Sequence, residues 1–263
     1  SLMSVLNFAH GQLYVLGGFV TYTAVVPLGL PFVVALMLSA VVLAIVGALI
    51  EHFLFRPVIR KSKRDESTML LAAGIAFFLD AVILLLFGEK QRGVPKLVDG
   101  VFNWDWRIVM PYDRILIGFI AIAMIVAFIL FMQYSKAGRA MRALAQDKTA
   151  AALMGVNVDR YSMLGFALGA MLAGLVGGLL VTITGINLGM GGPTSIKAFM
   201  MIMIGGAGVI SGAIAGGFIL GMMESVGLSV LSQYGDITYL VIFATLMVFL
   251  ALRPQGLMGK PWG

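Results

Sequence analysis

Long apolar runs alternate with short polar segments along the whole chain of 263 residues. A helix needs about 20 mainly apolar residues, within a range of about 17–25, to cross the hydrocarbon core of a bilayer. The lengths of the runs, and the charged, proline and glycine residues between them, predict eight membrane-spanning helices. The predicted spans are residues 4–26, 32–55, 69–87, 114–133, 161–183, 195–209, 212–231 and 237–252. The expected fold is therefore all-α, a polytopic helical bundle that forms one transmembrane domain over residues 1–263.

The composition supports a bilayer as the main solvent. Hydrophobic residues make up 60% of the chain and charged residues only 11%, whereas about a quarter of a soluble domain is charged. The absence of cysteine from the sequence excludes disulfides, thiolate metal sites and cysteine nucleophiles. The two histidines, His10 and His52, fall on different predicted spans, so we expect no metal site.

The net charge of +6 reflects membrane orientation rather than a nucleic-acid partner, because the basic residues sit in short loops between apolar runs. With eight spans, residues 56–66, residues 134–160 and the C-terminal tail share one side of the membrane. They hold 12 of the 18 Lys and Arg residues. Cytoplasmic loops carry the excess of Lys and Arg, so this side, with the C-terminus, is predicted to be cytoplasmic. Residues 88–113 then lie outside, as an interfacial element anchored by aromatic side chains or as a docking surface for an external partner.

Dense glycines predict breaks in two helices. GMGGP (189–193) and GGAG (205–208) hold too many glycines to remain helical. Interrupted helices are tolerated at membrane depth where the backbone is buried in protein or lines an aqueous cavity, and transporters place substrate sites there. Other glycines recur at a four-residue spacing that predicts close helix packing. These are Gly165/Gly169, Gly174/Gly178, Gly208/Gly212/Gly216 and Gly217/Gly221.

Several polar residues lie inside the apolar runs. Asn7 and His10 in NFAHG are three residues apart and so share a helical face, while Gly11 permits a kink or a close approach. The pair either satisfies a helix break or lines a substrate path. Asp80 is a functional candidate by its position in a span, or the acid of a structural hydrogen bond or ion pair, and Glu224 is expected to be structural. The candidate pathway residues are Asn7, His10, Gly11, Asp80, Gly191, Gly192 and Pro193.

The most specific segment is SKAGRAMRALAQDKTAAALMGVNVDR (135–160) on the predicted cytoplasmic side. Residues 140–154 predict one helix, which Gly155 ends in a left-handed turn. The residues expected to share one face are Met141, Leu144, Ala145 and Ala152. Such a short helix suits a groove on a partner protein, and a solvated surface helix is the alternative.

This segment resembles the coupling loop of ABC-importer permeases, whose pattern is Glu-Ala-Ala, three residues, then Gly. Here it stands as Thr149-Ala150-Ala151 followed by Gly155, with Thr149 where the pattern has Glu. GRAMRALAQD, NFAHG, GGAGVISGAIAGG and RPQGLMG (253–259) are similar, in the expected order, to the permeases of branched-chain amino acid importers of the LivH type. The resemblance covers essentially the whole chain. It implies the ABC-importer permease fold, a bundle with broken helices in the bacterial inner membrane, and one further helix upstream of residue 1.

The resemblance also implies partners. Two permease subunits, identical or homologous, form the pathway, two cytoplasmic ATP-binding subunits hold the coupling loops, and an external binding protein delivers branched-chain or hydrophobic amino acids. The sequence has no G-x-x-x-x-G-K-[ST] phosphate-binding loop, so ATP and Mg²⁺ are expected on the partner subunits and no cofactor or enzymatic activity on this chain. The residues expected at the ATPase contact are Arg139, Arg142, Asp147, Thr149, Ala150, Ala151 and Gly155.

Two alternatives remain open. The same architecture can serve urea, short amides or aromatic acids, because specificity can reside in the delivery protein. An ATP-independent channel or secondary transporter is the alternative from another class, since NFAHG and GMGGP can be interpreted as paired half-helices. The helix-forming cytoplasmic segment argues against it, because an autonomous channel has no need of such a docking element.

Overall fold

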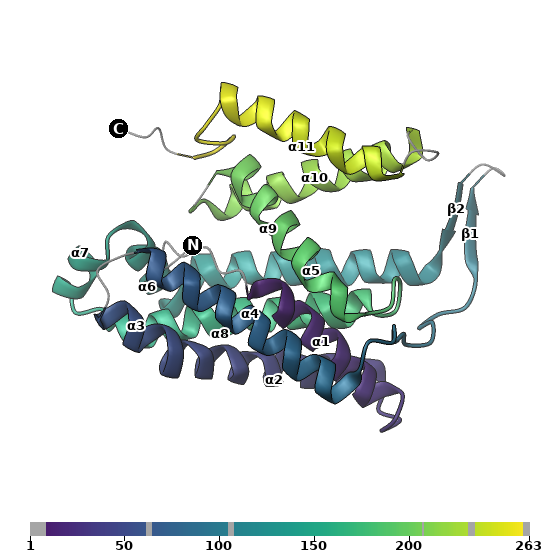
Figure 1. Ribbon diagram of the computed structural model, residues 1–263, viewed down its shortest axis with the longest axis horizontal. Helices are drawn as coiled ribbons and strands as arrows, with labels where there is room; N and C mark the ends of the chain where they lie inside the picture. The colour runs from purple at the N-terminus through teal and green to yellow at the C-terminus, as the bar shows by residue number, and fades with distance from the viewer. Residues whose placement is uncertain (1–8, 62–64, 105–107, 207, 231–234, 260–263) are drawn as a thin grey trace. The chain divides into compact units, whose positions relative to one another are not determined.

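The computed structural model describes residues 9–61, 65–104, 108–206, 208–230 and 235–259. The chain divides into two compact units, one within residues 2–192 and the other within residues 193–263. Figure 1 shows the elements in chain order by colour. In the first unit they are α1 (His10–Val25), α2 (Phe32–Ile50), the π-helical turn η1 (Glu51–Phe55), α3 (Arg56–Lys61), α4 (Asp65–Phe87), β1 (Val101–Trp104), β2 (Ile108–Pro111), α5 (Tyr112–Tyr134), α6 (Lys136–Gln146), α7 (Lys148–Leu153), α8 (Val158–Leu180) and the 3₁₀ turn η2 (Leu188–Met190). Helix α9 (Gly191–Gly205) leads into the second unit, which continues with α10 (Ile210–Val230) and α11 (Gly235–Leu252).

Helices occupy all eight predicted runs. Among the described residues, five are long and apolar enough to cross a membrane, namely Phe32–Lys61, Glu66–Phe87, Tyr112–Tyr134, Val158–Leu180 and Ile210–Val230. Helices α1 and α9 are shorter, with 16 and 15 residues. Helix α9 ends at Gly205 because positive φ angles at Gly206 and Gly208 stop it, which confirms the break predicted at GGAG.

The core of the first unit is α1 packed between α2 and α8. Leu13, Val15 and Phe19 on α1 are fully buried, and so are residues on its other sides, as expected for a helix that is apolar all round. Glycines make the close approach possible: a Cβ at Gly17 would lie 2.3 Å from the Cα of Gly174. Helix packing at the predicted glycine spacing is therefore confirmed at this contact.

In the second unit, glycines also allow close backbone contact at the corner between α9 and α10. A Cβ at Gly205 would lie 2.0 Å from the carbonyl oxygen of Gly212, and a Cβ at Gly216 would lie 2.1 Å from that of Met201. By contrast, a Cβ at Gly208 or Gly221 would meet no described atom within 4 Å. These two glycines therefore make no close helix contact among the described residues.

After α11 the chain folds back onto this corner. A turn at Gly256, whose φ is +74°, brings two backbone N–H groups to the end of α9. Leu257 N donates to the carbonyl of Ile204 at 2.9 Å, and Met258 N donates to that of Gly205 at 3.1 Å. The segment RPQGLMG thus satisfies carbonyls that the end of a helix leaves without partners.

The region between α4 and α5 contains a β-hairpin that the sequence pattern did not predict. Strands β1 and β2 pair antiparallel, with Val101 opposite Pro111. The buried Asp113 at the start of α5 accepts hydrogen bonds from the backbone N–H groups of Leu97 and Val98 at 2.8 and 3.0 Å. This carboxylate holds the segment before the hairpin against the first turn of α5.

Candidate functional site

The segment expected to couple to a partner is two short helices rather than one. Asp147 ends α6 with extended backbone, and its Oδ1 accepts hydrogen bonds from Thr149 N at 2.7 Å and Ala150 N at 3.0 Å. The prediction of one helix over residues 140–154 is therefore wrong, because an aspartate that caps a new helix competes with continuation of the previous one. Gly155, with a φ of +84°, ends α7 in the left-handed turn that was predicted.

The buried face of α6 packs on its own bundle. Met141 and Leu144 are 1% and 3% exposed, as their spacing predicted, and α6 begins on a Ser135 cap that accepts from Gly138 N at 2.8 Å. Ala145 is exposed, contrary to the predicted face. The exposed guanidinium groups of α6 cap the end of α5 by donating to carbonyl oxygens at 3.3 Å, and these pairs are Arg139 with Tyr134 and Arg142 with Gln133.

Helix α7 presents an apolar tip that sequence reasoning missed. Leu153 and Met154 are each 84% exposed, next to the turn at Gly155. Ala151 is buried whereas Ala152 is exposed, so the predicted face is wrong here too. The cause is the break at Asp147, because α7 starts a new helical phase that the periodicity of α6 does not continue. The signal in the sequence was the pair of large apolar residues directly before Gly155.

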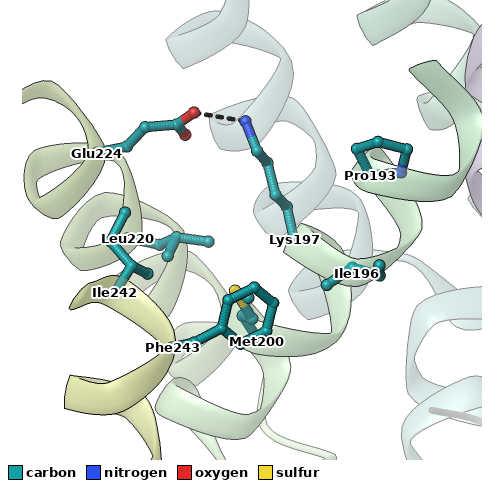
Figure 2. A pocket seen from close by; sticks show the side chains of 8 residues that line it. All are labelled: Pro193, Ile196, Lys197, Met200, Leu220, Glu224, Ile242 and Phe243. Atoms are coloured by element: carbon teal, nitrogen blue, oxygen red, sulfur yellow. Dashed lines mark hydrogen bonds and ion pairs between the residues drawn. The ribbon is translucent and has the colours of Figure 1, made fainter. Parts of the chain in front are cut away.

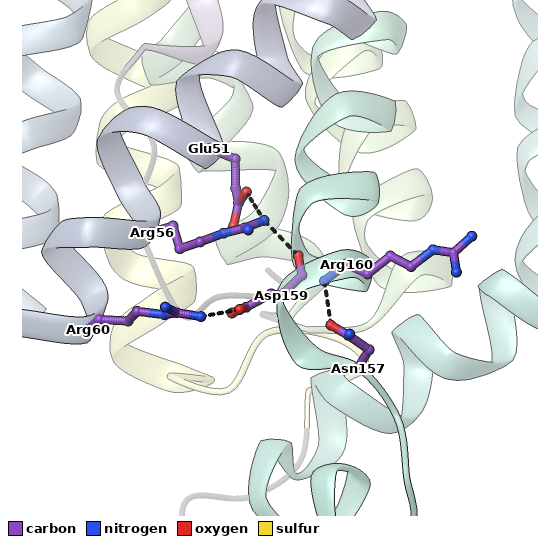
Figure 3. A network of polar contacts seen from close by, with 6 residues as sticks. All are labelled: Glu51, Arg56, Arg60, Asn157, Asp159 and Arg160. Carbon is purple, nitrogen blue, oxygen red and sulfur yellow. Dashed lines mark hydrogen bonds and ion pairs between the residues drawn. The ribbon is translucent and has the colours of Figure 1, made fainter.

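A polar network connects the start of α8, just after this tip, to η1 and α3, which follow α2 on the predicted cytoplasmic side (Figure 3). Arg56 Nη2 donates to Glu51 Oε2 at 2.9 Å and to the carbonyl oxygen of Asp159 at 3.2 Å. Arg60 forms an ion pair with the Asp159 carboxylate. Asn157 caps α8 by accepting from Arg160 N at 3.0 Å. Glu51 is buried, so its charge needs the Arg56 partner.

The candidate pathway residues lie in several places. Asn7 lies outside the described residues. His10 is the first residue of α1 and is half-buried, and a Cβ at Gly169 of α8 would lie 4.0 Å from its Cε1. Gly11 is buried inside α1. Asp80 is half-buried on α4, and its Oδ1 accepts no hydrogen bond from the described residues.

Gln12, which directly follows NFAHG, meets the GMGGP segment at Gly191, and sequence reasoning missed this residue. Gln12 is buried, and a Cβ at Gly191 would lie 2.4 Å from its amide group. Its Oε1 accepts no hydrogen bond from the part of the chain that the structure describes. Gly192 and Pro193 are exposed. The prediction that Gly191, Gly192 and Pro193 interrupt a helix is wrong: they form the first turn of α9, where the missing N–H of proline costs nothing.

No cluster of three or more His, Cys, Asp or Glu residues able to hold a metal ion occurs within the described ranges.

The comparisons with known proteins agree over almost the full length. The family described as "Branched-chain amino acid transport system / permease component" matches residues 1–250. Two similar proteins are the high-affinity branched-chain amino acid transport system permease proteins BraD of Pseudomonas aeruginosa and LivH of Escherichia coli K12. Each is 34% identical to this chain over 99% of its length, and the matched regions cover 88% of BraD and 87% of LivH. The fructose import permease protein FruG of Bifidobacterium longum is 25% identical over 87% of this chain and 67% of its own. No solved structure matches.

This agreement shows that the chain is a multi-pass membrane permease of a bacterial ABC transport system, and that system has further components. It is a transport subunit rather than an enzyme, and it needs no cofactor of its own. The chain belongs to the family of permease components of branched-chain amino acid transport systems.

Proposed function

We propose that this chain forms the membrane path through which branched-chain amino acids enter the cytoplasm. It acts with a second permease subunit, two cytoplasmic ATP-binding subunits and an external binding protein, in the bacterial inner membrane with its C-terminus in the cytoplasm. The substrate class rests on the names of BraD and LivH, each 34% identical to this chain. The excess of Lys and Arg on one predicted side supports the orientation.

The observation that carries the proposal is the apolar tip at the end of α7. Leu153 and Met154 project two large apolar side chains from a segment that is predicted, from the charge distribution, to be cytoplasmic. Burying such a side chain contributes about 1.5–3 kcal/mol, so a groove on an ATP-binding subunit gains from enclosing this tip. Asp147, Thr149, Ala150 and Ala151 support it by forming the capped start of α7.

The contacts around the tip give it a direct mechanical link to the bundle. The turn after Gly155 leads to the Asn157 cap of α8, and Arg56 and Arg60 hold Asp159 in the first turn of the same helix. Helix α8 packs on α1 where Gly174 meets Gly17. A movement of the tip by a partner is therefore passed to α8 and on to α1.

The start of α1 is the part of this link that we assign to the substrate path. His10, Gly11 and Gln12 lie there, and Gln12 contacts Gly191 at the start of α9. A buried amide with a carbonyl oxygen that receives no hydrogen bond within the described ranges is suited to accept one from a passing ammonium group. We keep Asn7, Asp80, Gly192 and Pro193 as further pathway residues.

The first test replaces both tip residues. Leu153→Asp with Met154→Asp places charges where the groove is apolar, so co-purification with the ATP-binding subunits should be lost and ATP-dependent leucine uptake by proteoliposomes should fall at least tenfold. Ile59→Asp is the matched control, because Ile59 is also an exposed apolar residue on the predicted cytoplasmic side. Both variants should elute as monodisperse permease.

Three outcomes would contradict the proposal. Association that survives the double substitution would remove α7 from the contact. Leucine uptake without any ATP-binding subunit would favour an ATP-independent channel. Uptake of urea, fructose or an aromatic acid with no competition from leucine would keep the architecture and replace the substrate class.

A further inference from the structure

The amide group that we assign to the substrate path is covered in this structure. Gln12 is only 7% exposed. Residues 184–190, here called the strap, lie between α8 and α9 and run along α1. A Cβ at Gly18 would lie 2.9 Å from Cγ1 of Ile186, and Gly191, directly after the strap, contacts the amide of Gln12. A solute therefore reaches this amide only when a covering segment moves.

The cavity of the second unit gives a charged solute no polar partner. It lies among α9, α10 and α11, has a volume of about 130 Å³, and the surface that lines it is apolar (Figure 2). Lys197 Nζ lies 2.5 Å from Glu224 Oε1, and Figure 2 shows the two charged ends pointing toward each other. The covered amide of Gln12 is therefore the polar group whose exposure needs a structural explanation.

The loop that follows α4 fastens one end of the strap. Arg92 and Ile186 exchange both backbone hydrogen bonds, from Arg92 N at 2.9 Å and from Ile186 N at 2.7 Å. Gln91 Nε2 donates to the carbonyl oxygen of Thr184 at 2.7 Å. The guanidinium of Arg92 also lies over the ring of Tyr22 near the end of α1, 5.7 Å from its centroid. Gln91 and Arg92, here called the clip, thus hold the strap to α1 on the predicted external side.

The strap is less firmly held than the helices beside it. Helices α1 and α8 meet through the close backbone contact of Gly17 with Gly174. The strap has a left-handed residue at Gly185, whose φ is +69°, and the short 3₁₀ turn η2. Of residues 184–190, all of which the structure describes, Ile186 alone is buried. Segments with few buried side chains and exposed hydrogen bonds open at a lower free energy than packed helices, so the strap moves before α1 and α8 separate.

We propose that the strap is an external gate of the substrate path, which the clip holds closed over Gln12. The inference rests on the proposed function, because it takes Gln12 as part of the path. Opening of the clip lifts the strap from α1. The Gln12 carbonyl oxygen, which accepts no hydrogen bond from the described residues, then faces the external solution. Closing of the clip shields the amide again.

The first test locks the clip with a reversible bridge. The chain has no cysteine, so Gln91→Cys with Thr184→Cys places two thiols at exposed positions of the clip and the strap. A short bifunctional methanethiosulfonate bridges them, and dithiothreitol removes the bridge. ATP-dependent leucine uptake by proteoliposomes with the complete complex should fall at least tenfold on bridging and return on reduction, because a locked strap cannot uncover Gln12.

The matched control bridges a pair outside the strap. Asn103→Cys with Val109→Cys replaces facing, exposed residues of the β1–β2 hairpin, and its bridge should leave uptake unchanged. Uptake that persists with positions 91 and 184 bridged would overturn the gate, and so would an equal fall in both pairs. Thiols at 91 and 184 that the reagent fails to bridge would show that the clip does not hold the strap, which also overturns it.

The second test releases the clip. Gln12→Cys serves as a reporter, labelled in right-side-out vesicles by a membrane-impermeant maleimide. Adding Arg92→Ala removes the contact with Tyr22, so labelling should speed up at least fivefold. Arg92→Lys keeps a cation over the ring and should change the rate less. Lys96→Ala removes an exposed basic residue of the same loop outside the clip and should leave the rate unchanged. Equal rates in all four chains would overturn the gate.

ATPase association and uptake by the unaltered complex are measured on the same preparations. Normal association, together with uptake that the bridge does not reduce, would refute the gate and leave the proposed function standing. Absence of ATP-dependent leucine uptake by the complex with the unaltered chain would refute the proposed function itself.

Discussion

At the scale of single residues, one hydroxyl group joins three helices. Ser39 Oγ on α2 lies 3.0 Å from the carbonyl oxygen of Gly17 on α1 and 3.3 Å from that of Gly174 on α8. In lipid, helices gain little from apolar burial against one another, so close backbone approach and such hydrogen bonds hold them together. The absence of side chains at Gly17 and Gly174 is what allows one serine to reach both helices.

Substituting one of these glycines tests the contact. Gly17→Ala places a Cβ 2.3 Å from the backbone of Gly174, so α1 and α8 must separate, and we expect a large drop in the melting temperature of the purified permease. Gly74→Ala on α4 is the control, because its Cβ would meet no described atom within 4 Å. Alanine inside a helix is favoured over glycine by about 0.5–1 kcal/mol, so the control should be neutral or stabilising. Equal melting temperatures would refute the close contact.

At the scale of elements, the α6–α7 segment depends on Asp147. This residue stops one helix and caps the next, which fixes the direction in which α7 carries its apolar tip. The break also separates two functions: α6 is held to the bundle through Met141 and Leu144, while α7 keeps Leu153 and Met154 exposed. A continuous helix would rotate the tip to a different side.

Asp147→Ala should loosen α7 without unfolding the bundle. Loss of an N-cap costs about 1 kcal/mol, which corresponds to about a fivefold increase in local opening. Hydrogen exchange of residues 150–154 should speed up by that factor, and uptake per ATP hydrolysed should fall. Asp147→Asn keeps a side chain that caps well, so it should resemble the unaltered chain. Identical exchange in Ala and Asn variants would show that the cap does not hold α7.

At the scale of the whole molecule, the orientation in the membrane follows from charge and is open to direct measurement. The sequence contains no cysteine, so a single introduced thiol reports one position. Met154→Cys at the tip of α7 and Met110→Cys on β2 both replace exposed side chains. In inside-out vesicles a membrane-impermeant maleimide should label position 154 and not 110, and in right-side-out vesicles the reverse. Labelling of both from one side would refute the predicted topology.

Some elements of the fold could be predicted from the sequence and others could not, for physical reasons. Apolar runs dictate helices in lipid because each backbone polar group must be satisfied internally, so all eight runs are helical. The β1–β2 hairpin and the break at Asp147 were missed, because short segments between the long apolar runs are decided by local caps and strand pairing that helical periodicity does not register. The contact between Glu51 and Arg56 was not predictable from its spacing, because residues five apart do not share a face of an α-helix and only the π-helical turn η1 brings them together. Gln12 was not predictable either, because only the fold brings it to Gly191.

The return of the chain from Gly256 to the end of α9 has a consequence for biosynthesis. The carbonyl groups of Ile204 and Gly205 receive their backbone partners from Leu257 and Met258, which the ribosome adds some fifty residues later. Until then, the corner between α9 and α10 has to enter the bilayer from the translocon incomplete, with those two acceptors hydrated or held by the insertion machinery. Completion of the hydrogen bonds at this corner therefore waits until the segment after α11 has been synthesised.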